Sequence, residues 1–263
     1  GEVIGCGRSA ENLDLAFDLG VIDGHTSDPA EAVKDADMVL LAVPLGAMRS
    51  TFERMNGALC GGAVVTDAGS VKGSVVADAA AVFGQVPDWL VPGHPIAGTE
   101  RSGVAASFPE LHHNRRVILT PLPQTDPNAV SKVRAMWQAA GAEVTEMDVA
   151  HHDQVLAATS HLPHMLAFGL VDTLARMQDT DEIFRYAAGG FRDFTRIASS
   201  NPVMWRDICI ANAEALCGML ERFGEEMSDL SQTIRRGDGD HLLEIFTRAK
   251  HARDCFVDGL DRK

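Results

Sequence analysis

The sequence contains little cysteine, and no two cysteines are separated by only two residues. The five cysteines are odd in number and scattered along the chain: Cys6, Cys60, Cys209, Cys217 and Cys255. A disulfide framework and a structural zinc site are therefore not expected, because both need cysteines in close or paired spacing. Unpaired cysteines of this kind are typical of a reducing compartment, so we expect a cytoplasmic protein.

Basic residues are also scarce. The 263 residues include 23 Lys and Arg against 37 Asp and Glu, which gives a formal net charge of −14. Sequence-independent binding to nucleic acid and docking on an anionic membrane both need a surplus of cations, so neither is expected. The longest apolar run, residues 38–48, is interrupted by Pro44 and Gly46 and is shorter than the ~18 residues of a membrane-spanning helix. An anionic small-molecule substrate is not excluded, because a few local cations can dominate one pocket.

Up to about residue 148, short apolar runs alternate with helical stretches. The runs predict strands, with a fully buried one at 38–43 and others at 63–67, 89–91, 117–120 and 143–147. Strands rich in Val, Leu and Ile that are separated by helices indicate a parallel sheet covered on both faces. The sequence therefore predicts an α/β fold with a Rossmann-like, doubly wound parallel sheet.

The helix starts in this part are well marked. Asp28-Pro29 and Asp126-Pro127 each offer a capping carboxylate followed by proline at the first helical position. These pairs predict helices that begin directly after each aspartate.

Strand patterns disappear after about residue 149. Residues 155–177 are apolar on most sides, which predicts one helix buried among others. A second helix is expected from Asn201 to about Gly224, followed by two more. We therefore expect an α/β domain at 1–148 and an all-helical domain at 149–263. A helical domain of this size with apolar helix faces predicts a homodimer, which would bury them.

Gly5, Gly7 and Ala10 match the loose dinucleotide-binding pattern G-x-G-x-x-A. If this were the first turn of the fold, the acid that binds the ribose would be Asp28, about 20 residues later. Asp28 is better explained as a helix cap because Pro29 follows it.

Alternatively, this segment is the end of the second strand, which normally faces the adenosine ribose. Arg8 and Ser9 would then contact the cofactor. The absence of an acid beside Arg8 favours tolerance of a 2′-phosphate, as in NADP. On this interpretation, the first strand and its glycine loop would lie upstream of Gly1.

Several motifs follow one another in a specific order. Residues 93–100 read Gly-His-Pro-Ile-Ala-Gly-Thr-Glu, and residues 189–196 read Gly-Gly-Phe-Arg-Asp-Phe-Thr-Arg. Ser-His-Leu-Pro-His lies between them at 160–164, while Asp-Ala-Gly-Ser-Val-Lys precedes them at 67–72. Together they resemble the prephenate/arogenate (cyclohexadienyl) dehydrogenase family of tyrosine biosynthesis.

The resemblance implies an oxidative decarboxylation with NAD or NADP. Prephenate would give 4-hydroxyphenylpyruvate, and arogenate would give tyrosine. The chemistry needs a neutral base at the ring hydroxyl and a cation for the dianionic substrate. By resemblance, His94 is the catalytic base, in a loop after a strand, and a hydrogen bond from Ser70 orients it.

The resemblance also assigns binding residues. Arg196 would pair with a substrate carboxylate, for which a guanidinium fork is well shaped. Further residues of the pocket are His164, Thr99, Glu100, Gly189 and Trp205, while Val43 and Pro44 would touch the cofactor ribose. Core packing is a competing explanation for Trp205, and a surface ion pair is one for Arg196.

Two other enzyme classes and one non-enzymatic role stay open at this point. His161 and His164, with His151, His152 and Asp153 before them, could suggest a metal-dependent hydrolase, although we expect no metal because their spacing is poor. A β-hydroxyacid dehydrogenase would need a lysine near the hydride site. A non-catalytic nucleotide-binding module is the third alternative.

Overall fold

The computed structural model describes residues 1–98 and 103–261. The chain divides into two compact units, Gly1–Leu216 and Cys217–Lys263. The predicted domain boundary after residue 148 stays a prediction.

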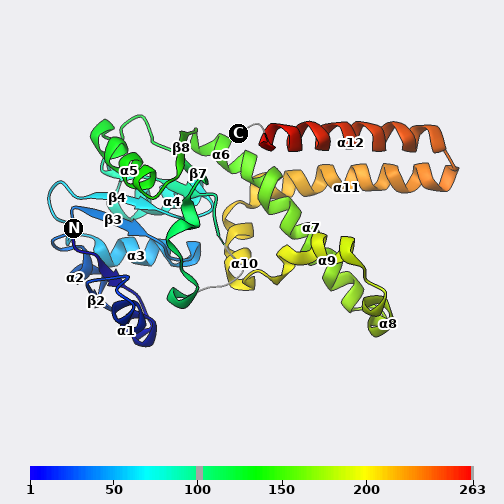
Figure 1. The fold of residues 1–263 in the computed structure, drawn as a ribbon. Coiled ribbons are helices and arrows are strands. Elements are labelled where there is room, and N and C mark those ends of the chain that lie inside the picture. Colours follow the sequence, from blue (N-terminus) through cyan, green and yellow to red (C-terminus); the bar gives the residue numbers. More distant parts are fainter. Residues whose placement is uncertain (99–102, 262–263) are drawn as a thin grey trace. The chain divides into compact units, whose positions relative to one another are not determined.

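Eight short strands form three sheets in the described part of the first unit (Figure 1). One sheet pairs β1 (Ile4–Cys6) with β2 (Gly24–Thr26), and a second has the order β3 (Met38–Leu41), β4 (Val64–Asp67), β5 (Leu90–Val91). Both of these sheets are parallel throughout. The third has the order β6 (Gly93–Pro95), β7 (Arg116–Leu119), β8 (Glu143–Glu146).

The predicted strands are confirmed as elements, with two corrections. Leu40 is 43 % exposed, so the strand at 38–43 is not fully buried. The reason is that β3 is hydrogen-bonded to β4 on one side only. His94 lies in β6 rather than in a loop, since it pairs antiparallel with Ile118 of β7.

The helices of this α/β part connect successive strands. Their bounds are α1 (Ala10–Asp18), α2 (Pro29–Val33), α3 (Met48–Met55), α4 (Lys72–Phe83) and α5 (Pro127–Ala139). The predicted caps are confirmed, because Asp28 accepts from the amide of Ala30 and Asp126 accepts from that of Asn128. Short 3₁₀ turns complete the connections at Leu45–Ala47, Val104–Ala106 and Pro109–His112.

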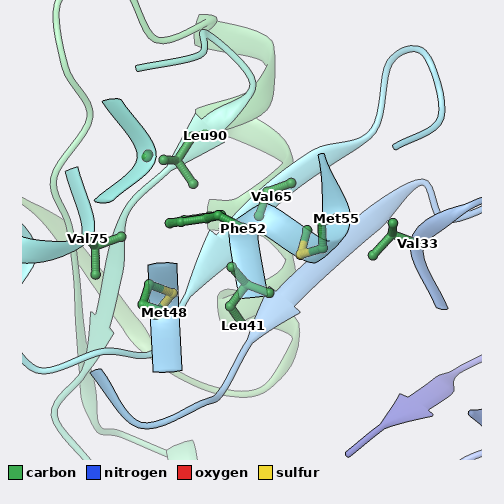
Figure 2. Close-up of a cluster of buried hydrophobic side chains, with 9 residues drawn as sticks. Val33, Leu41, Met48, Phe52, Met55, Val65, Val75 and Leu90 are labelled. Atoms are coloured by element: carbon green, nitrogen blue, oxygen red, sulfur yellow. The ribbon is translucent and has the colours of Figure 1, made fainter. Parts of the chain in front are cut away.

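Two apolar clusters cover opposite faces of the β3-β4-β5 sheet. On one face, Val65 packs with Phe52 of α3 and Val75 of α4 (Figure 2). On the other face, its neighbour Val64 packs with Val133 and Trp137 of α5. Successive side chains of a strand point to opposite faces, so both faces of this sheet are buried under helices. This arrangement confirms the predicted doubly wound α/β class.

The rest of the first unit is helical, as predicted, but the helix expected at 155–177 is interrupted. The structure has α6 (Val149–Leu156), a π-helical turn (Ala157–His161) and then α7 (Leu162–Ala175). Pro163 has no N–H, so it cannot donate to the carbonyl four residues earlier, and the wider turn lies just before it.

The remaining helices of this unit are α8 (Thr180–Arg185), α9 (Gly189–Thr195) and α10 (Pro202–Ala211), with a 3₁₀ turn at Arg196–Ser199. The single helix expected from Asn201 to Gly224 is wrong. It ends at Ala211, and α11 (Ala213–Arg236) begins after Asn212 and continues through Gly224. Asn212 forms tertiary hydrogen bonds at this break, which a periodicity in the sequence does not reveal.

The second unit is a helical hairpin. It consists of α11 from Cys217 onward and α12 (Gly239–Asp261). An imidazole–carboxylate contact of 3.6 Å joins His241 of α12 to Asp229 of α11. Large apolar side chains are exposed on both helices, among them Ile234, Leu243 and Phe246.

Candidate active site

The site begins where β4 and β5 end. Parallel strands place their carboxyl ends at one edge of a sheet, which is where open α/β sheets bind ligands. At this edge, Asp67 ends β4 and Lys72 begins α4, while His94 follows β5 by three residues. The motif at 67–72 and the motif around His94 therefore meet at the edge expected of a ligand site.

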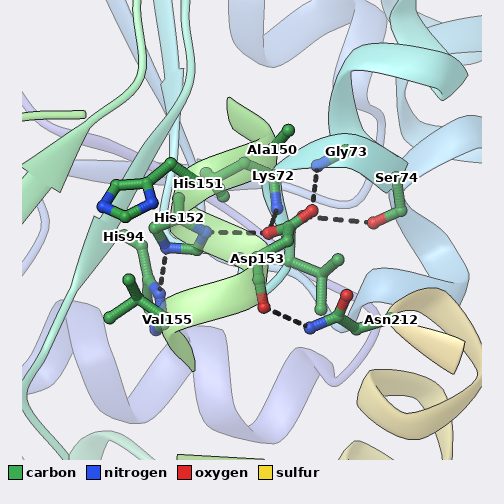
Figure 3. A network of polar contacts seen from close by, with 12 residues as sticks. Lys72, Gly73, Ser74, His94, Ala150, His151, His152, Asp153, Val155 and Asn212 are labelled. Atoms are coloured by element: carbon green, nitrogen blue, oxygen red, sulfur yellow. Dashed lines mark hydrogen bonds and ion pairs between the residues drawn. The ribbon is translucent and has the colours of Figure 1, made fainter. Parts of the chain in front are cut away.

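A chain of hydrogen bonds runs from His94 into α6 (Figure 3). The Nδ1 atom of His94 lies 2.9 Å from Nε2 of His152. The Nδ1 atom of His152 lies 2.8 Å from a carboxylate oxygen of Asp153. His94 is 8 % exposed, and its engaged Nδ1 leaves Nε2 as the ring nitrogen available to a ligand.

The environment of His94 keeps its ring neutral. Burial lowers its pKa well below the ordinary value of 6.5, and the nearby positive charge of Lys72 lowers it further. A neutral imidazole can accept a proton at pH 7, as a general base must.

A buried ion pair holds the residue before His94. The Lys72 ammonium pairs with the Asp67 carboxylate, and both side chains are completely buried. The same ammonium donates to the carbonyl of Gly93, while Asp67 accepts from the Gly93 amide at 3.1 Å. Both backbone groups of Gly93 are therefore fixed. The Lys72 ammonium is thus occupied by Asp67 and the Gly93 carbonyl.

His164 and Trp205 form a second part of the site. Their rings stack with centroids 3.6 Å apart, and His161 meets Trp205 edge-on at 6.0 Å. Burial lowers the pKa of His164, the hydrogen bond with the Ser160 carbonyl raises it, and the charge of Arg196 lowers it. The 3₁₀ turn that begins at Arg196 packs against α7, the helix that carries His164. Trp205 also packs against Val71, next to Ser70 and Lys72, so it belongs both to the core and to the neighbourhood of the site.

His161 lies beneath this pair on the π-helical turn. It is 1 % exposed, and burial is the main cause that lowers its pKa to about 4. Its Nδ1 accepts from the side chain of Asn212 at 3.1 Å, and the same amide donates to the backbone carbonyl of Asp153 at 2.8 Å. Asn212, which lies between α10 and α11, is thus hydrogen-bonded both to α6 and to the π-helical turn.

The other predicted site residues fall into three groups. Val43 packs at the edge of the first apolar cluster, and Pro44 precedes the 3₁₀ turn after β3. Gly189 begins α9, close in sequence to Arg196. Thr99 and Glu100 lie outside the described residues.

Arg8 and Ser9 follow β1. Arg8 is exposed, and the Ser9 hydroxyl caps α1 by accepting from the amide of Asn12 at 3.2 Å. Ser9 therefore has a structural role as the N-cap of α1 beside its predicted contact with the cofactor.

The predicted role of Ser70 in orienting His94 stays a prediction. The structure shows a hydrogen bond between Nδ1 of His94 and Nε2 of His152. From the sequence, His152 and Asp153 are expected only as part of a hypothetical metal site, and their contact with His94 is not predicted. The run His-His-Asp at 151–153 was a usable signal, but the fold alone brings it to His94.

The part of the chain that the structure describes offers neither a metal site nor a membrane span. No group of three or more His, Cys, Asp or Glu side chains is arranged to hold a metal ion there. Nor does any described helix combine the length and apolar character needed to cross a membrane.

Comparison with family models decides the family. Residues 1–146 match the nucleotide-binding domain of prephenate dehydrogenase, and residues 148–248 match its dimerization domain. The chain belongs to the prephenate dehydrogenase family. The resemblance deduced from the motifs is thereby confirmed.

Individual members of the prephenate dehydrogenase family agree. The chain is 40 % identical over 243 residues to the cyclohexadienyl dehydrogenase of Zymomonas mobilis, covering 91 % of this chain and 82 % of that protein. It is 35 % identical to the prephenate dehydrogenase of Bacillus subtilis, covering 96 % and 68 %.

A solved structure of the family is also similar. It is the prephenate dehydrogenase of A. aeolicus in complex with hydroxyphenyl propionate and NAD+, with a TM-score of 0.89 and 39 % identity, covering 96 % of this chain and 88 % of that one. These matches confirm the oxidoreductase class and do not support the hydrolase or β-hydroxyacid dehydrogenase alternatives.

Proposed function

We propose that this protein catalyses the oxidative decarboxylation of prephenate, arogenate or both, with NAD or NADP as the oxidant. The observation that carries the proposal is the buried, neutral His94, held through Nδ1 at the ligand-binding edge of a parallel sheet. The relatives named for these substrates support the choice of reaction.

The chain's residues fit a nicotinamide dinucleotide. The exposed Arg8 follows β1, which we interpret as the second strand of the dinucleotide fold, whose end meets the adenosine ribose. Its neighbours in the sequence, Gly7 and Ser9, carry no carboxylate that would repel a 2′-phosphate. Val43 and Pro44 follow β3 at the same edge as His94. When bound, the cofactor supplies the two-electron oxidation of the ring carbon that carries the hydroxyl.

His94 would accept the proton of that hydroxyl and later return it. Its Nε2 takes the proton as the ring carbon is oxidised to the carbonyl level. The bond to the ring carboxylate then breaks, CO2 leaves, and the bonding electrons complete the aromatic ring. The oxygen becomes a phenol when His94 returns the proton, so the residue ends neutral, as it began.

The substrate carboxylates would be held on the other side of the pocket. We propose that Arg196 pairs with one of them, and that the stacked rings of His164 and Trp205 form a wall against the substrate ring. Gly189, Thr99 and Glu100 would complete the entrance. The observation in support is that the 3₁₀ turn beginning at Arg196 packs against α7, the helix that carries His164.

The test is turnover with each substrate and each cofactor. We expect the absorbance of reduced nicotinamide to grow with prephenate or arogenate, and NADP to be accepted as well as NAD. Replacing Arg8 by Ala should lower kcat/KM for NADP about tenfold, because a charge-assisted contact to the 2′-phosphate contributes roughly 1.5 kcal/mol, and leave NAD nearly unchanged.

Ser27→Ala is the control, since Ser27 lies outside the proposed cofactor contacts and should leave the NADP to NAD ratio unchanged. Strict dependence on NAD in the wild type would refute the role of Arg8. No reduction with any of the four combinations would refute the proposed function itself.

We also propose that the protein is a cytoplasmic homodimer that associates through its helical part. The match of residues 148–248 to a dimerization domain and the exposed apolar side chains of the hairpin support the dimer. Light scattering should give about twice the 28.2 kDa of one chain. Phe246→Asp, at a side chain 56 % exposed, should weaken the dimer, whereas Leu19→Asp, at an equally exposed position on the α/β part, should not. A wild-type monomer at micromolar concentration would contradict the proposal.

A further inference from the structure

We infer that Asp153 and His152 are positioning residues that set which nitrogen of His94 carries the proton, and that they stabilise His94 when it takes a second one. The inference concerns the protonation of the free protein. Its catalytic consequence rests on the proposed function.

The first step is the anchoring of Asp153. Its carboxylate accepts from the backbone amides of Lys72 and Gly73, each at 2.8 Å, at the N-terminus of α4. It also faces the ring of His152. Burial raises the pKa of this carboxyl, but the hydrogen bonds from His152, Lys72 and Gly73 outweigh burial, so that its pKa lies below its ordinary value. Asp153 is therefore an ionised acceptor at neutral pH.

The ionised Asp153 determines which nitrogens of His152 and His94 carry protons. An ionised carboxylate can only accept, so the Nδ1 atom of His152 must be the donor in their 2.8 Å contact. In a neutral His152 the other nitrogen, Nε2, is then an acceptor. The Nδ1 atom of His94, 2.9 Å away, must donate to it. A neutral His94 that carries its proton on Nδ1 has a free lone pair on Nε2, the atom that is left for the substrate.

The opposite order shows what Asp153 prevents. If Nε2 of His152 carried the proton, it would donate to Nδ1 of His94. A neutral His94 would then have its proton on Nε2 and could not accept one from a hydroxyl. Two His residues in contact can adopt either arrangement of their protons. The carboxylate of Asp153, on the other side of His152, favours the arrangement with a proton on Nδ1 of each ring.

The same chain accommodates the charge that forms during turnover. A proton arriving on Nε2 of His94 makes a cation in a place where burial and Lys72 both disfavour it. Passing the Nδ1 proton from His94 to Nε2 of His152 moves the positive charge to the ring that contacts Asp153. The move is reversible, transfers one proton and leaves no net change when the product receives its proton from His94.

Among the residues that the structure describes, the ionisable groups around His94 and His152 come from four elements. Lys72 of α4 and Asp67 of β4 form their own pair beneath His94. His161 of the π-helical turn is held by Asn212, and its pKa of about 4 keeps it neutral at pH 7. Asp153 is the anion that contacts His152. The experiment therefore removes the charge of Asp153.

The experiment is a long-range ¹H–¹⁵N spectrum of the full chain labelled with ¹⁵N-histidine, assigned with His94→Asn and His152→Gln. In the wild type at pH 7.5 we expect His94 with a protonated Nδ1 and an unprotonated Nε2. In Asp153→Asn, whose amide can donate to His152, we expect the pattern of His94 to reverse and kcat to fall roughly a hundredfold or more, since a wrong tautomer disables a base. His151→Asn, at the exposed neighbour on α6, should change neither.

A second pair of variants keeps the test decisive if Asp153→Asn does not fold. His152→Gln retains an acceptor for Nδ1 of His94 through its side-chain oxygen and should keep both the tautomer and part of the activity. His152→Leu offers no acceptor and should lose both. Equal spectra of His94 in these two variants would overturn the inference, as would a wild-type His94 protonated on Nε2.

The outcomes separate the inference from the proposed function. A wild type with the expected tautomer but no turnover of prephenate or arogenate would refute the function and leave the protonation pattern standing. A reversed tautomer in Asp153→Asn with unchanged kcat would refute the positioning role while the proposed function stands.

Discussion

Replacing His94 by Asn is expected to lower kcat by about 10²- to 10⁴-fold, the range that general bases contribute. The asparagine side chain can still form a hydrogen bond to His152, but it presents no basic nitrogen to the substrate hydroxyl. The loss should therefore appear in kcat rather than in KM, because Arg196, His164 and Trp205, the proposed substrate contacts, are unchanged. Initial rates from the reduced-nicotinamide absorbance, with circular dichroism to verify folding, provide the measurement.

The pH dependence of the wild type is a second test of His94 as the base. Burial and Lys72 hold the pKa of His94 well below 6.5, so the neutral base persists as the pH falls below that value. We expect kcat/KM on the acid side to decline only below pH 6.5, and His94→Asn to lose this limb. His151→Asn is the matched control and should keep both the rate and the pH profile. A variant at His94 that retained more than a tenth of the wild-type kcat would contradict the assignment of the base.

The sequence predicted the parts of this fold that depend on local patterns. The buried strands and the caps at Asp28 and Asp126 follow from apolar runs and from capping chemistry, and the structure has them within one or two residues. The strand β6 was missed because three residues, Gly93–Pro95, carry no periodic signal, and only their pairing with β7 makes them a strand.

The site was predictable only where a motif names the residue. His94 was identified because its motif resembles the family, whereas His152 and Asp153 are 58 and 59 positions further on and reach it through tertiary packing. The π-helical turn has a local cause in Pro163, but the hydrogen bond that holds the buried His161 comes from Asn212, 51 positions further along the chain. Hydrogen bonds over such separations are decided by topology, which a single sequence does not display.

Replacing Lys72 by Met is expected to destabilise the α/β part by roughly 3–5 kcal/mol, because removal of one partner leaves a buried charge uncompensated. Burial lowers the pKa of the Lys72 ammonium, and the charge and hydrogen bond of Asp67 oppose that shift, so each group makes the other tolerable in the interior. After the substitution, Asp67 retains the amides of Gly69 and Gly93 but no cation. Thermal unfolding should show the midpoint lowered by roughly 10 °C for a chain of this size.

The control is Lys250→Met, which removes the ammonium of an exposed pair with Asp254 on α12 and should change the stability by less than about 0.5 kcal/mol. The double variant Asp67→Asn, Lys72→Met should recover part of the loss, because no unpaired charge is left inside. Equal melting temperatures for Lys72→Met and the wild type would contradict the role of the pair.

The pair also fixes both backbone groups of Gly93, so the double variant, even where it regains stability, should not regain the full kcat. We therefore expect the double variant to recover stability but not full activity. A neutral interior needs no compensating charge, whereas the position of His94 depends on the hydrogen bond from the Lys72 ammonium to the Gly93 carbonyl.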